Sequence, residues 1–144
     1  MNILIFLIVL GLLPLVLGGC LITPDSNGLV KIPASWTSFP YRAFYQCSSL
    51  QTLVFESDSH LQSIGNDTFH QSGLRGTITI PASVTSIGEQ AFYQCSSLTG
   101  VVFSCASYVF INIGTFSQTS VSNVSLPDGA KCDSCGVPVE RLPN

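Results

Sequence analysis

Cys132 and Cys135 stand at a spacing that three kinds of chemistry use. Two thiolates separated by two residues can form half of a zinc site, a thioredoxin-like redox pair or a disulfide. A zinc site needs two further ligands, and the two histidines, His60 and His70, lie far earlier in the chain with no second cysteine pair beside them. The sequence therefore favours a disulfide among Cys105, Cys132 and Cys135, which leaves one thiol over; alternatively, this run begins a cysteine-rich module.

A second group of reactive side chains consists of Glu56, Asp58 and His60. Carboxylates beside an imidazole can transfer protons or bind a metal ion. The surrounding sequence has no glycine-rich phosphate loop, no nucleophile motif and no second histidine at ligand spacing. We therefore interpret these residues as parts of a surface loop, and we predict a chain that is not an enzyme and has no catalytic residue, metal or cofactor.

Segment 1–22 contains no charged side chain and is mostly apolar. It predicts a signal peptide or, alternatively, a membrane anchor, because a span needs about 20 apolar residues. Val16 and Gly18 favour cleavage before Gly19, whereas the run that ends in Cys20 resembles a lipobox and makes Cys20 a candidate for lipidation. Under each alternative the rest of the chain is secreted or displayed at the cell surface. It would contact the membrane only through this N-terminal segment or through a lipid on Cys20.

The charge content argues against nucleic acid as a partner. The chain has 8 acidic and 5 basic residues among 144, a net charge of −3, and only 9% charged residues. A soluble domain usually has about 25%. The five cations are scattered, so they form no basic stripe that could neutralise phosphates.

The chain repeats itself at short, nearly regular intervals. Segments 32–55 and 80–103 are identical at two thirds of their aligned positions, and four phenylalanines, Phe44, Phe69, Phe92 and Phe116, recur with almost even spacing. A period of this size, about two dozen residues, predicts stacked structural units, each too small to bury its apolar face alone. We therefore expect about four units that share one internal phenylalanine column.

Each unit begins with a short run in which apolar and polar residues alternate, which predicts a half-buried strand. These runs occupy residues 29–32, 52–55, 77–80, 100–103 and 123–126. Later in one unit, Ser86 and Glu89 have the spacing of a capping box, which predicts one or two helical turns that carry Ala91 and Phe92 inward. Strand, turn, short helix and return together predict a short right-handed α/β solenoid with a parallel sheet on its inner face.

The pattern I-P-x-S-V-T-x-I-G-x-x-A-F-x-x-C-x-x-L-x-x-V-x-F, intact over 80–103 and nearly intact over 32–55, resembles the BspA-type leucine-rich repeat. The resemblance covers about 29–127 and departs from the pattern at Trp36 and Pro40. It implies a secreted or cell-surface protein, often one that adheres to host or matrix proteins, and it brings no catalytic residues. The expected organisation is a signal peptide or anchor at 1–22, repeats at 23–127 and a cysteine-containing tail at 128–144.

Cys47 and Cys95 occupy the same position in two units, three residues after the unit phenylalanine. Two units in a parallel stack separate their Cα atoms by about 10 Å, beyond the reach of roughly 7 Å for a disulfide. We therefore predict that both thiols are reduced and buried. Cys20, if it survives cleavage, could pair with the thiol left over in the tail.

The outward side chains of the sheet are the default binding surface of a solenoid. They carry one charge, so recognition would depend on shape, hydroxyl groups and exposed valines. The candidate binding residues are Lys31, Thr52, Val54, Thr77, Thr79, Val102, Asn123 and Ser125. We expect a non-catalytic module that binds an extracellular protein or glycan, with homotypic stacking through a solenoid end as a further mode; the alternative is a structural spacer without a ligand.

Two sequons, at Asn66 and Asn123, are candidate N-glycosylation sites. Each requires a host that glycosylates its secreted proteins. Asn123 falls at an outward position of the last predicted strand, so a glycan there would obstruct one end of the sheet face.

Overall fold

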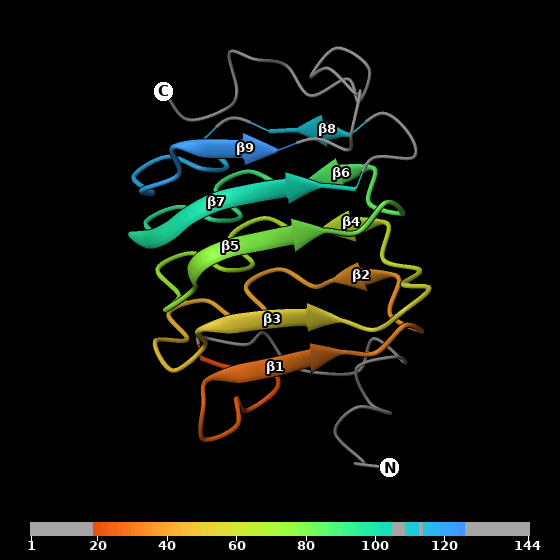
Figure 1. Cartoon of the computed structure of the whole chain (residues 1–144), viewed down its shortest axis with the longest axis horizontal. Helices are drawn as coiled ribbons and strands as arrows, with labels where there is room; N and C mark the ends of the chain where they lie inside the picture. Colours follow the sequence, from red (N-terminus) through yellow and green to blue (C-terminus); the bar gives the residue numbers. More distant parts are fainter. Residues whose placement is uncertain (1–18, 105–108, 113, 126–144) are drawn as a thin grey trace.

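The computed structural model describes residues 19–104, 109–112 and 114–125, and these form a solenoid of stacked coils (Figure 1). One side carries the strands β1 (Leu29–Ile32), β3 (Thr52–Phe55), β5 (Arg75–Ile80), β7 (Ser97–Phe103) and β9 (Asn123–Ser125). The other side carries the two-residue strands β2 (Ser38–Phe39), β4 (Ser63–Ile64), β6 (Ser86–Ile87) and β8 (Phe110–Ile111). All strand pairs are parallel. The predicted solenoid with a parallel sheet is therefore confirmed.

The larger strands alternate as their sequences predict. Val30 and Ile32 in β1, and Ile78 and Ile80 in β5, are buried, whereas Lys31 between the first pair is exposed. Apolar residues on one face of a strand become buried only when a second layer covers them. Here the chain itself supplies that layer, because each coil returns along the opposite side through β2, β4, β6 and β8.

A column of phenylalanine rings runs through the centre of the stack. Phe44, Phe69, Phe92 and Phe116 are buried, and successive rings stack nearly parallel with centroids 5.4, 5.0 and 5.2 Å apart. Phe39 meets both Phe44 and Phe69 edge-on. Each ring thus takes much of its apolar contact from the neighbouring coils, which confirms the predicted column.

The predicted helical turns are wrong: the described residues contain no helix. The segment after β2 forms successive tight turns in which Arg42 and Gln46 have positive φ angles of 59° and 58°. A left-handed residue interrupts a right-handed helix. The amides of Arg42, Phe44 and Gln46 instead donate hydrogen bonds to carbonyls of the next coil.

The capping-box interpretation fails for the same reason. Ser86 lies in β6, and the amide of Glu89 donates to Oδ1 of Asn66 in the preceding coil, at 3.0 Å. The backbone donors that a helix would satisfy internally are therefore satisfied between coils. These hydrogen bonds tie neighbouring units together.

We expect Phe92→Ala to lower the free energy of unfolding by about 3–5 kcal/mol, because it empties a buried site between two stacked rings. The control is Tyr41→Ala, at a side chain that is 49% exposed. That change should cost less than about 1 kcal/mol. Urea denaturation followed by circular dichroism measures both, and equal losses for the two variants would contradict the internal column.

Candidate functional site

The larger strands carry the candidate binding residues, and the strands within each ladder pair in the predicted register. Leu29 pairs with Thr52, and Lys31 with Val54. Likewise, Thr77 pairs with Gly100, and Thr79 with Val102. Thr52, Val54, Thr77 and Thr79 are exposed, while Val102 is partly exposed. The backbones of Asn123 and Ser125 pair with Gly100 and Val102, and their side chains lie outside the described part of the structure.

This face is interrupted once among the described strands. β1 pairs with β3, and β7 pairs with both β5 and β9, but no ladder joins β3 to β5. Figure 1 shows the wider interval between β3 and β5, whereas the small strands on the opposite side continue without a break. The sequence therefore folds into one continuous solenoid whose larger sheet is divided in two.

The division coincides with a local lengthening of the repeat. Seven residues, 56–62, separate β3 from β4, whereas five separate β1 from β2 and five separate β5 from β6. At the opposite end of the gap, the amide of Arg75 donates to the carbonyl of Gln51, at 3.1 Å. The two strands are thus tied where they begin and are separated towards their carboxyl ends.

A groove of about 490 Å³ occupies this gap. Its lining includes three of the candidate binding residues, Val54, Thr77 and Thr79. The longer loop contributes Glu56, Asp58 and Ser59, and the rest of the lining consists of Leu53, Phe55, Pro81, Ala82, Ser83 and Ser104. We call this site the β3–β5 groove.

The groove carries acidic charge and a free hydroxyl. Glu56 and Asp58 are the charged residues of its lining. Glu56 Oε2 accepts a hydrogen bond from the amide of Ala34, at 3.1 Å, which fixes the loop against the preceding coil. Oγ of Ser83 is buried and has no hydrogen-bond partner among the described residues. A buried hydroxyl without a partner is costly unless a ligand or water satisfies it.

His60 also stabilises the loop, because its Nδ1 lies 3.1 Å from the carbonyl oxygen of Ala34. The structure therefore places Glu56 and His60 against the backbone of one residue, as expected of a loop rather than of an acid–base pair. Within the described residues, no three His, Cys, Asp or Glu side chains are positioned to hold a metal ion. Cys105, Cys132 and Cys135 lie outside those residues.

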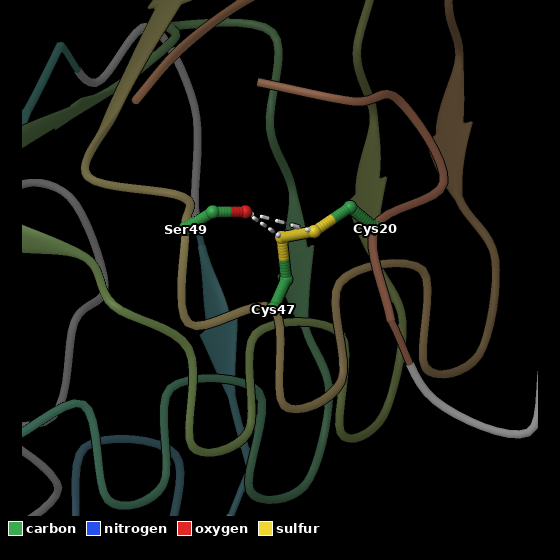
Figure 2. Close-up of a disulfide and its surroundings, with 3 residues drawn as sticks. All are labelled: Cys20, Cys47 and Ser49. Atoms are coloured by element: carbon green, nitrogen blue, oxygen red, sulfur yellow. Dashed lines mark hydrogen bonds between the residues drawn. A yellow bond between two sulfur atoms is a disulfide. The ribbon is translucent and has the colours of Figure 1, made fainter. Parts of the chain in front are cut away.

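Cys20 and Cys47 form a disulfide with a Cα–Cα distance of 5.0 Å (Figure 2). The prediction that Cys47 is reduced is therefore wrong. The distance between repeat units excluded Cys95 as the partner of Cys47. The partner is instead Cys20, which lies in a segment before the repeats. A sulfur in a disulfide cannot also carry a thioether lipid, so this bond and lipidation of Cys20 exclude each other. The hydroxyl of Ser49 lies 3.5 Å from the Cys20 sulfur and 3.9 Å from the Cys47 sulfur.

The segment that carries Cys20 covers the first coil. The amide of Gly19 donates to the carbonyl of Tyr45, at 2.6 Å, and the amide of Leu21 donates to Ala43, at 2.9 Å. The partner number falls as the donor number rises, so the segment runs antiparallel to the coil. It takes the place that a preceding coil would occupy.

Cys95 is a free, buried cysteine, as predicted. Its thiol donates to the carbonyl of Phe69, at 3.0 Å, and lies 3.3 Å from the hydroxyl of Ser72. Burial raises the pKa of Cys95 to about 11, against which the hydrogen bond with Ser72 acts only partly. The thiolate is therefore scarce near neutral pH, and the residue is poorly suited to nucleophilic chemistry.

The candidate glycosylation sites stay predictions. Asn66 is exposed, and its Oδ1 accepts the amide hydrogen of Glu89. Thr68 of the same sequon is buried and donates its hydroxyl to the carbonyl of Gly65. Among the described residues, no helix has the length and hydropathy to cross a bilayer. The segment where the sequence predicts a signal peptide or anchor lies almost entirely outside them.

The double variant Cys20→Ser/Cys47→Ser should be less stable by about 3 kcal/mol, because the disulfide joins cysteines with a sequence separation of 27 and so restricts the unfolded chain. Comparison of urea denaturation of the wild type with and without reductant provides the second measurement. The reduced wild type should match the double variant. If reduction leaves the stability of the wild type unchanged, the disulfide does not form in solution.

The pKa of Cys95 predicts a loss of stability at high pH. A raised native pKa means that, above about pH 9, the unfolded chain releases the thiol proton while the folded chain keeps it. This contribution to stability is therefore complete below pH 9 and lost as the pH rises towards 11. The difference in free energy of unfolding between wild type and Cys95→Ala should shrink by roughly 2–3 kcal/mol over that range. A constant difference would show that the thiol is not desolvated.

Comparison with protein families identifies one match, to the model described as BspA type leucine rich repeat region, in six copies, over residues 26–133. Comparisons with curated proteins and with solved structures find no match. The matched segment is well over half of the 144 residues and contains every described strand and the β3–β5 groove. The chain therefore belongs to the BspA-type leucine-rich repeat family.

Proposed function

We propose that this chain is a non-catalytic interaction module that binds an extracellular protein or glycan through the outward face of its larger strands. The observation that carries the proposal is the face itself, where exposed short side chains from β3 and β5 surround a groove. Ligand-binding sites are typically concave, with volumes of about 300–1,000 Å³, and the groove of about 490 Å³ lies in that range. Repeat families commonly use such surfaces for recognition.

Export of the chain is supported by two independent features. Disulfides persist in oxidising compartments, and the structure contains one between Cys20 and Cys47. The apolar segment 1–22 is typical of a signal peptide. Cleavage before Gly19 would leave Cys20 in the mature chain, where the disulfide needs it. We therefore place the module outside the cell or on its surface, as is typical of the family.

The N-terminal end of the solenoid is covered, which argues against stacking of a second copy on that end. The amides of Gly19 and Leu21 already donate hydrogen bonds to carbonyl oxygens of the first coil. A second copy would have to displace this segment to stack there, and the disulfide at Cys20 holds the segment in place. We therefore place binding on the side of the solenoid rather than at this end.

The double variant Thr52→Arg/Thr77→Arg should abolish binding, because two long cations replace short hydroxyl side chains on the proposed face. The matched control is Thr37→Arg/Ser117→Arg, at two exposed positions off that face. Arrays of purified extracellular proteins and glycans, probed with the secreted chain, provide the measurement. Equal binding by both variants and the wild type would remove the face from the function.

A further inference from the structure

We propose that the β3–β5 groove binds a short extended peptide segment of the partner, one that carries a lysine or arginine side chain. This inference rests on the proposed function and names the class of ligand for one part of the face. Its argument depends on main-chain groups, on the shape of the gap and on the charge of the lining.

The main chain on both sides of the gap points into it. The amides of Thr52 and Glu56 donate to carbonyls of the β1 coil, Gly28 and Ile32. Because successive peptide groups of a strand point to opposite edges, the amides and carbonyls of Leu53 and Phe55 point away from β1, towards β5. With no ladder between β3 and β5 in the described part of the chain, residues 53 and 55 present an unpaired edge.

The same reasoning applies to β5. The amide of Ser104 donates to the carbonyl of Ile80, so Ile80 faces β7. Thr77 and Thr79 alternate with Ile78 and Ile80 along the strand, and their peptide groups therefore face β3. An unpaired strand edge is a template for a further strand, and edge addition is an established mode of peptide recognition. Here two such edges face each other across one groove.

The gap between β3 and β5 is closed at one end and wider at the other. Adjacent strands lie about 4.8 Å apart, so an inserted strand requires about twice that interval. β3 and β5 are the neighbours that show the wider interval in Figure 1, and the groove fills it. The bond from Arg75 to Gln51 closes the gap at the start of the strands. The site is therefore a wedge, which admits a short segment from the end where β3 and β5 finish.

The loop that widens the gap also sets its charge. Asp58 adopts a positive φ of 59° within the longer loop, and Glu56 is fixed by the amide of Ala34. Both carboxylates belong to the groove lining, which contains no lysine, arginine or histidine among the described residues. A basic side chain next to these carboxylates gains attraction, whereas an acidic one is repelled.

The probes are labelled pentapeptides with blocked ends, and fluorescence anisotropy measures their binding to the full secreted chain. Val-Lys-Val-Lys-Val should bind, and Val-Glu-Val-Glu-Val should bind at least 10-fold more weakly. The basic probe with N-methylated central amides should also lose at least 10-fold, because it cannot pair with the strand edges. Equal affinity of the three peptides would overturn the proposal.

Variants locate the site. Thr79→Arg should weaken the basic probe at least 10-fold and Asp58→Asn about 5-fold, while Thr37→Arg, off the face, stays within twofold of wild type. If Thr52→Arg weakens the probe and Thr79→Arg does not, the ligand lies on the face but outside the groove. The groove proposal then fails while the proposed function stands. If instead an oligosaccharide binds the wild type but not Thr79→Arg, and displaces the peptide probe, the ligand of the groove is a glycan and the peptide proposal fails.

Discussion

The structure depends on contacts that each coil receives from the next one. No single coil can enclose its own phenylalanine: the ring of Phe69 is buried because Phe44 and Phe92 stack on its two faces. The backbone follows the same rule, since amides near each ring donate to the adjacent coil. Gly88 shows how closely the coils approach, because a Cβ atom there would collide with Oδ1 of Asn66. Stability is thus a property of neighbouring pairs of coils.

Such a stack needs a special first coil, and the chain provides one by folding back on itself. The segment at Gly19 and Leu21 binds carbonyls that would otherwise be open, and the Cys20–Cys47 disulfide fixes it. The disulfide therefore connects the stability of the solenoid to the redox state of its compartment. At the β3–β5 groove the loop is two residues longer and the larger sheet is interrupted, yet the rings of Phe44 and Phe69 on either side of that loop still stack.

Features that repeat could be predicted from the sequence, and features that occur once could not. The strands follow from alternation, and the column follows from the nearly even spacing of its phenylalanines. The helical turns were wrong because the capping pattern at Ser86 does not reveal the left-handed backbone of Gln90 and Gln94. The partner of Cys47 was missed because Cys20 belongs to no repeat. The interval from Phe44 to Phe69 is the longest in the column and contains the longer loop, but spacing alone does not say that the sheet opens there.

Residue-resolved amide hydrogen exchange of the disulfide-bonded chain tests the central claim most directly. If neighbouring coils hold one another, the amides of Phe44, Phe69 and Phe92, which donate between coils, belong to the slowest class. The amides of Phe55 and Thr79, which point into the open groove, should exchange at least about 100-fold faster. Fast exchange at the three phenylalanines, or equal protection at all five residues, would contradict the account.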